Sequence, residues 1–315
     1  MALSTPQSVG GVAASSVTTD ITSGRRDIKG KVLEGMLIIA LAGSLLILAI
    51  LIVDLRRRSW PVWTERPGDF LRGPLNSANA AEAGVGQAIR GTLELALIVA
   101  IVAIPLGTAC AIYLEEYASR SRLASFTRLN VRNLAGVPSI VYGLLGLAIF
   151  VQFFGLGRSI WAGGLALSAL VLPIVVITAS EALRAVPQSI REGAYGVGAT
   201  RWETTSRHVL PAAGPGILTG VVLSLARAAG EAAPILLVGA ATGLLRTGSQ
   251  SFFDQLGSAF TALPVAIFSY ARQPGEAFRE VTAAASLVLL VLVLLMNGIA
   301  IWLRNRYERK LSLIH

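Results

Sequence analysis

Charged residues are scarce in this 315-residue chain. Asp, Glu, Lys and Arg together make up 14% of it, hydrophobic residues make up 54%, and the mean hydropathy is +0.66. An ordinary soluble domain carries about 25% charged residues. The chain is therefore too apolar for a soluble domain of its size, and its composition indicates an integral membrane protein.

Metal ligands and nucleophiles are also scarce. Cys110 is the only cysteine, and His208 and His315 are the only histidines. A single cysteine excludes an internal disulfide and a cysteine-based metal site, and no H-E-x-x-H or acidic calcium loop is present, so we expect no cofactor. None of the three lysines is followed by Ser or Thr, which excludes a G-x-x-x-x-G-K-[ST] nucleotide loop. We expect no catalytic residues, and if ATP drives this protein, another polypeptide binds it.

The sequence is instead rich in long apolar runs. Six are near the length of about 20 residues that a membrane-crossing helix needs. They cover residues 34–55, 91–113, 133–154, 160–180, 212–240 and 281–303. Because lipid offers no partner for an open backbone, the runs predict an all-α bundle of six transmembrane helices. Prolines at four positions predict kinks in these helices: Pro105, Pro138, Pro173 and Pro234.

The remaining segments predict the domain organisation. Residues 1–33 are expected to form a disordered cytoplasmic tail, 34–90 the first transmembrane helix with a long, irregular extracytoplasmic loop, 91–303 the core, and 304–315 a short basic tail. A second long loop, 241–280, is a candidate for a short interfacial helix. The net charge of +9 does not indicate nucleic acid, since the basic residues are spread over loops. With both termini in the cytoplasm most of these residues fall on the inner side, although the cluster at 56–58 opposes this orientation.

The polar stretch 188–211, QSIREGAYGVGATRWETTSRHVLP, carries helix-start signals between two apolar runs. Ser189 precedes Glu192 by three residues, and Thr200 precedes Glu203 by three, so each pair predicts a capping box and a short helix. Capping boxes are common, and taken alone they indicate only an ordered loop.

Two further residues define the ends of these helices. Gly198 is predicted to end the first in the left-handed conformation, and Pro211 to end the second. An apolar stripe with helical spacing and an aromatic residue favour a surface on which a partner docks. These residues are Ile190, Ala194, Val197 and Trp202.

Arg227 and Glu231 stand four residues apart inside the fifth apolar run, the spacing of an ion pair on one helix face. A charge inside a membrane is costly, so these side chains must face the bundle interior, a partner or water. The residues alone leave two interpretations open: a buried pair that fixes the helix register, or a polar point on an anion path. Glu94, in the outer part of the second run, is a weaker candidate.

The stretch 188–211 resembles the cytoplasmic loop of ABC importer membrane subunits, whose pattern is E-A-A, three residues, G, nine residues, then I-x-L-P. The matching residues are Glu192, Gly193, Ala194, Gly198, Leu210 and Pro211. Two positions depart from the pattern. Gly193 replaces the first alanine and His208 the aliphatic residue, while the spacing is unchanged.

Further stretches are similar to the PstA-type permeases of phosphate ABC importers: Thr92–Ala118, Gly136–Leu144 and Arg227–Leu237. The resemblance implies a type I ABC importer permease fold in the bacterial plasma membrane, surrounded by membrane lipid. It also implies a PstC-type permease, two copies of a PstB-type ATPase and an extracytoplasmic PstS-type phosphate-binding protein as partners. The 188–211 loop would couple to the ATPase, and Arg227 and Glu231 would take part in phosphate passage. Alternatives are a permease for phosphonate, sulfate or molybdate, or a membrane channel or signalling scaffold.

Overall fold

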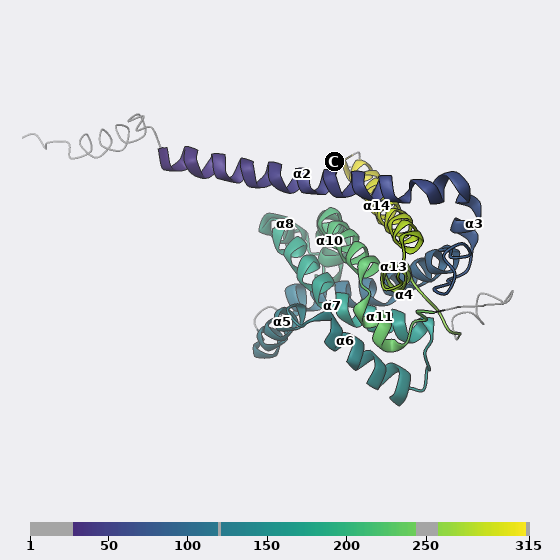
Figure 1. Ribbon diagram of the computed structural model, residues 1–315. Coiled ribbons are helices and arrows are strands. Elements are labelled where there is room, and N and C mark those ends of the chain that lie inside the picture. Colours follow the sequence, from purple (N-terminus) through teal and green to yellow (C-terminus); the bar gives the residue numbers. More distant parts are fainter. Residues whose placement is uncertain (1–27, 119–120, 244–257, 313–315) are drawn as a thin grey trace, which may run out of the picture. The chain divides into compact units, whose positions relative to one another are not determined.

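The computed structural model describes residues 28–118, 121–243 and 258–312, and within these residues all regular structure is helical (Figure 1). The prediction of an all-α protein is confirmed. The chain divides into two compact units, Met1–Asp54 and Leu55–His315. The described part of the first unit is one helix. Most of the predicted N-terminal tail, residues 1–27, lies outside the described residues.

Helix α2 (Ile28–Glu65) contains the predicted first span and extends beyond it on both sides. The prediction of an irregular loop from residue 56 is wrong for its first part, because α2 continues to Glu65 and α3 (Pro67–Arg72) follows directly. Pro61 lies inside α2. A proline removes one backbone hydrogen bond, and the residues shortly before it, Leu55 and Arg56 to Arg58, are good helix formers that favour the helix up to this point.

The irregular part of this loop is limited to residues 73–85 and is held by polar contacts to its backbone carbonyls. The Arg66 guanidinium donates to the carbonyls of Ala81 and Ala83. The hydroxyl of Tyr270, a fully buried side chain, donates to the Gly84 carbonyl at 2.6 Å. The loop is therefore ordered, because its backbone acceptors find partners inside the protein.

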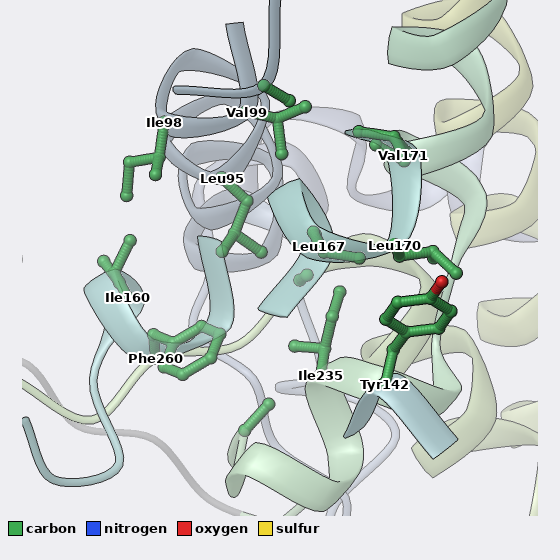
Figure 2. Packing of buried hydrophobic residues seen from close by; sticks show 14 of the residues in the cluster. Leu95, Ile98, Val99, Tyr142, Ile160, Leu167, Leu170, Val171, Ile235 and Phe260 are labelled. Atoms are coloured by element: carbon green, nitrogen blue, oxygen red, sulfur yellow. The ribbon is translucent and has the colours of Figure 1, made fainter. Parts of the chain in front are cut away.

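The second unit is built around α7. The long helices of this unit that follow α2 are α4 (Gly86–Ile112), α7 (Ile160–Ala185), α10 (Leu210–Gly230) and α14 (Glu276–Ser312). Helix α7 packs against α4 and α10, and Figure 1 shows it between them. Two thirds of the most apolar stretch of α7 is buried. Figure 2 shows the cluster at its centre, where Leu167 of α7 lies near Leu95, Tyr142 and Ile235.

The third predicted span is broken. It consists of α5 (Arg122–Ala135), followed by α6 (Ser139–Gly146) and the π-helix η2 (Leu147–Phe153), with a bend of 102° between the two parts. Pro138 causes the break, because a proline disfavours helical geometry in the preceding residue. Within the part of the chain that the structure describes, five helices are long and apolar enough to cross a membrane, or up to six when the bent pair counts as one span.

The fifth predicted span is also interrupted. Helix α10 ends at Gly230, and the short helix α11 (Ala233–Val238) begins two residues after Glu231. Pro234 occupies the first turn of α11, where its missing N–H needs no partner. Helices α4 and α7, in contrast, continue through Pro105 and Pro173.

The later segments match the predictions in part. A short helix, α13 (Leu263–Ala271), lies in the predicted second loop, of which residues 244–257 are outside the described part. The predicted C-terminal tail is helical up to residue 312, since α14 continues through the last apolar residues without a break.

Candidate functional site

Residues 188–211 contain two helical segments joined by a short turn, and the stretch is here called the elbow. The first is α8 (Gln188–Gly196), and the second is α9 (Arg201–Glu203) continued by the π-helix η3 (Thr204–Val209). Gly198 lies between them with a φ of +85°, in the left-handed region that L residues with a side chain rarely adopt. The predicted glycine junction is confirmed.

One of the two predicted capping boxes is present. The Thr200 N–H donates to Glu203 Oε2 at 2.9 Å, and the Glu203 N–H donates to Thr200 Oγ1 at 3.3 Å. The prediction for Ser189 and Glu192 is wrong, because α8 begins at Gln188 and its N-cap is Pro187, which makes no side-chain cap bond. The fixed φ of Pro187 starts the helix earlier and places Ser189 inside its first turn.

Pro211 does not end the second helix. The chain is helical from Arg201 to Gly230, and Pro211 lies in the first turn of α10. The π-helical turn before it explains the difference. Here the Leu210 N–H bonds the Thr205 carbonyl, five residues back. A wider turn reduces the clash between a proline ring and the preceding carbonyls, so the proline is accommodated.

The elbow has a buried face and an exposed face. Ala194 is buried, and Ile190 packs against a cluster that includes Leu183 and Val209. Val197, the third member of the predicted stripe, is 85% exposed instead, because the chain has left the helix at that point.

The candidate residues divide between these faces. Glu192, Gly193 and Gly198 are exposed, and Leu210 and Pro211 are half-buried. Trp202 is 66% exposed. The elbow thus presents polar residues beside apolar ones, which suits contact with a partner protein.

Two glutamates that the sequence analysis did not single out connect the elbow region to the bundle. Glu115 and Glu116 lie in the π-helix η1 (Tyr113–Tyr117), which continues α4. Two nitrogens of Arg184 donate to the Glu115 carboxylate at 2.7 and 2.8 Å, and two nitrogens of Arg191 donate to Glu116 at 2.8 and 3.4 Å. The signal in the sequence was a pair of acidic residues directly after an apolar run, a position where charges usually face water.

These ion pairs border a cavity of about 560 Å³ between η1, the end of α7 and the elbow. Its charged lining residues are Glu115, Glu116, Arg184, Arg191 and Arg201. The Arg201 guanidinium lies over the ring of Tyr117, 5.1 Å from its centroid. The negative charges of the two carboxylates in the cavity wall are therefore both neutralised by arginines of the same wall.

Arg227 and Glu231 lie at the break between α10 and α11. Their closest charged atoms, Arg227 Nε and Glu231 Oε1, are 3.7 Å apart. Arg227 is in the last turn of α10, but Glu231 is extended, with ψ of 121°, so the two do not share a continuous helix as predicted. The Arg227 side chain is 47% exposed and that of Glu231 21% exposed. The pair is not a buried one. Glu94 is half-buried in α4 and is distant in sequence from both the elbow and the pair Arg227 and Glu231.

A family model described as the binding-protein-dependent transport system inner membrane component matches residues 103–312, which include α7, the elbow and the α10 break. The chain belongs to this family. Its members are transport permeases, and the apolar helices make this chain an integral membrane protein.

Similar curated proteins include permeases of named systems. The phosphate transport system permease protein PstA 1 of Mycobacterium tuberculosis (strain ATCC 25618 / H37Rv) is 38% identical over 79% of this chain and 76% of its own length. The PstA of Mycobacterium leprae (strain TN) is 40% identical over 69% of this chain and 68% of its own length. The PstA of Yersinia pestis is 38% identical over 70% of this chain and 72% of its own length.

Solved structures support the fold. A bacterial ABC transporter involved in the import of the acidic polysaccharide alginate matches with a TM-score of 0.56 and 16% identity, over 92% of this chain and 99% of its own. The MetNI methionine ABC transporter in an inward-facing conformation matches with a TM-score of 0.53 and 17% identity, over 71% of this chain and 94% of its own. The fold is that of an ABC importer permease.

Proposed function

We propose that this chain is a permease subunit of an ATP-driven importer of inorganic phosphate. One observation carries the choice of cargo class: Arg227, half-exposed at the break between α10 and α11, makes no hydrogen bond within the described residues. Its nearest carboxylate atom, at 3.7 Å, is beyond hydrogen-bonding distance. Its guanidinium donors are therefore available to an oxyanion, for which a planar fork is well suited. The PstA relatives support phosphate as the anion.

Glu231 limits how tightly Arg227 can bind an oxyanion, so the anion can move on after binding. A carboxylate at 3.7 Å competes weakly for the guanidinium and repels a second anion, so a bound oxyanion is held without being trapped. The break after Gly230 also leaves backbone groups of α10 and α11 free of helical partners, as non-helical backbone at membrane depth is tolerated where it lines a polar path.

We propose that the elbow contacts a PstB-type ATPase. The complete importer would contain two copies of this ATPase and a PstC-type second permease. A PstS-type binding protein would deliver phosphate from outside. In this arrangement both termini and the elbow lie in the cytoplasm. The exposed apolar and aromatic residues Tyr195, Val197 and Trp202 support the contact, because the buried face of the elbow is already used by the bundle.

The test of the cargo is uptake of labelled phosphate, with sulfate as the second substrate, in cells that lack this chain and carry a variant of it. Arg227→Gln is expected to abolish uptake while the complex still assembles. The matched control is Arg279→Gln, which breaks an exposed pair of the same type in α14 and should leave uptake unchanged. Restored sulfate uptake by the unchanged chain would point to another oxyanion, and failure of Arg227→Gln to assemble would make the pair structural.

The test of the elbow is co-purification with the ATPase. Trp202→Ala is expected to weaken the association, because an exposed aromatic at a contact surface contributes strongly to binding. The control is Trp60→Ala, a tryptophan of similar exposure outside the elbow. If no ATPase co-purifies with the unchanged chain, a channel or signalling scaffold becomes the better interpretation.

A further inference from the structure

Helix α8 of the elbow is bound to the bundle by one polar side chain. Within α8, all of which the structure describes, Arg191 is the residue whose side chain makes hydrogen bonds. It donates to the Glu116 carboxylate, and it also donates to the carbonyls of Leu183 and Val186 at 2.9 Å each. The arginine therefore joins α8 to the end of α7 and to η1 at the end of α4.

This link is shielded from water. The Arg191 side chain is 13% exposed and that of Glu116 is 6% exposed. Paired charges in such surroundings attract each other more strongly than at a wet surface, and a two-bond fork fixes their relative orientation. The other contacts of α8, through Ile190 and Ala194, are apolar and non-directional. Arg191 is thus the one contact of α8 that resists sliding as well as separation.

The neighbouring glutamate is bound elsewhere. Glu115 accepts from Arg184 of α7 at 2.7 Å and from Arg128 of α5 at 3.3 Å. Because consecutive residues of a helix point in different directions, one carboxylate of η1 faces α5 and α7 and the next faces α8. The η1 segment is therefore the point where α4, α5, α7 and the elbow are joined by ion pairs.

We propose that Glu116 and Arg191 are positioning residues that pass a displacement of α8 to the cytoplasmic end of α4, while Glu115 moves α5 and α7 with it. The proposal rests on the function proposed above, in which an ATPase displaces the elbow. The covalent path from α8 into α10 is softer, because it runs through Gly198, whose backbone is less restricted than that of any other residue type. The ion pair bypasses this softer junction.

Hydrogen–deuterium exchange on the purified complex tests the link, with and without ATP and vanadate. In the unchanged complex, exchange is expected to change on adding nucleotide both at residues 188–198 and at residues 111–117. In Glu116→Gln, which keeps the shape of the side chain, the response at 188–198 should remain and that at 111–117 should be lost. Glu276→Gln makes the same chemical change at an exposed ion pair of α14, outside the elbow, and is the control that should respond at both segments.

The outcomes separate the two proposals. An equal response of residues 111–117 in Glu116→Gln and in the unchanged complex would overturn the link, and so would failure of this variant to assemble, because the pair would then serve stability. No response at 188–198 in the unchanged complex would instead contradict the proposed coupling of the elbow to an ATPase. Arg191→Lys, which keeps the charge but not the fork, is expected to retain part of the response at 111–117, and a loss as complete as in Glu116→Gln would also refute the role of the charge.

Discussion

Replacing Gly198 by alanine is the most direct perturbation of the elbow. The residue has a φ of +85°, and a Cβ built on it meets no atom within 4 Å. Any effect of the substitution must therefore come from the backbone rather than from a steric clash. For an L residue the left-handed conformation costs about 1 to 2 kcal/mol, so Gly198→Ala should destabilise the junction between α8 and α9 by that amount.

The elbow supplies a matched control for this change. Gly193 lies inside α8, also has open space around its Cβ position, and has an ordinary helical φ. Alanine is favoured over glycine in a helix by roughly 0.5 to 1 kcal/mol. Gly193→Ala is therefore expected to stabilise α8, so that the same chemical change has opposite signs five residues apart.

Hydrogen exchange of the α8 and α9 amides measures both effects, because local opening controls exchange there. One to two kcal/mol corresponds to exchange about 5 to 30 times faster in Gly198→Ala. The expected gain in Gly193→Ala corresponds to exchange about 2 to 5 times slower, since about 1.4 kcal/mol is a factor of ten. Phosphate uptake per ATP hydrolysed should fall in Gly198→Ala at unchanged protein levels. Equal exchange in both variants would refute the argument from backbone conformation.

Three further changes test the rest of the structure. Thr200→Ala should destabilise the start of α9 by about 1 kcal/mol, as for a lost helix cap, whereas Ser189→Ala should have no such effect because Ser189 makes no cap bond; hydrogen exchange of the two helices compares them. Gly143→Ala should lower the heat-inactivation midpoint of the complex, because its Cβ would lie 2.8 Å from the backbone Cα of Pro234, where neither helix can yield easily. Burial raises the pKa of Tyr270 to about 12, above the value of about 10 in an unfolded chain. The neutral phenol therefore stabilises the fold fully below about pH 10, and this contribution is lost between about pH 10 and 12; Tyr270→Phe should remove that part of the alkaline loss seen in the inactivation midpoint.

The apolar runs were sufficient to predict the class of fold, because a membrane imposes length and composition on each helix separately. They did not predict where helices break. The prolines located two of the breaks: the third run bends by 102° at Pro138, and the fifth is interrupted after Gly230, close to Pro234. Local signals succeeded where one residue dominates, as at Gly198. They failed at Ser189 and Pro211, where a neighbouring proline or a widened turn changed the helix start.

The ion pairs around η1 were beyond local reasoning for a different reason. Glu116 and Arg191 are 75 residues apart, and neither position carries a recognisable motif with the other. Only packing α4, α7 and the elbow together reveals that the two charges meet. The pair Arg227 and Glu231 was visible because its spacing is local, although its geometry depends on the break.

The two candidate regions obey the same physical rule. A membrane helix satisfies its own backbone, so it offers a ligand or a partner few polar groups except where its regular geometry ends. The break after Gly230 exposes Arg227, and the π-helical turns η1 and η3 stand at the two membrane helices that border the elbow. Gly198 restrains the backbone between the two helices of the elbow only weakly, so motion entering α10 through that junction alone would be partly absorbed before it reached Arg227. The ion pair between Arg191 and Glu116, which is shielded from water, provides a second and stiffer connection. The flexible glycine junction lets the elbow move, and the ion pair keeps it connected to the bundle while it does so.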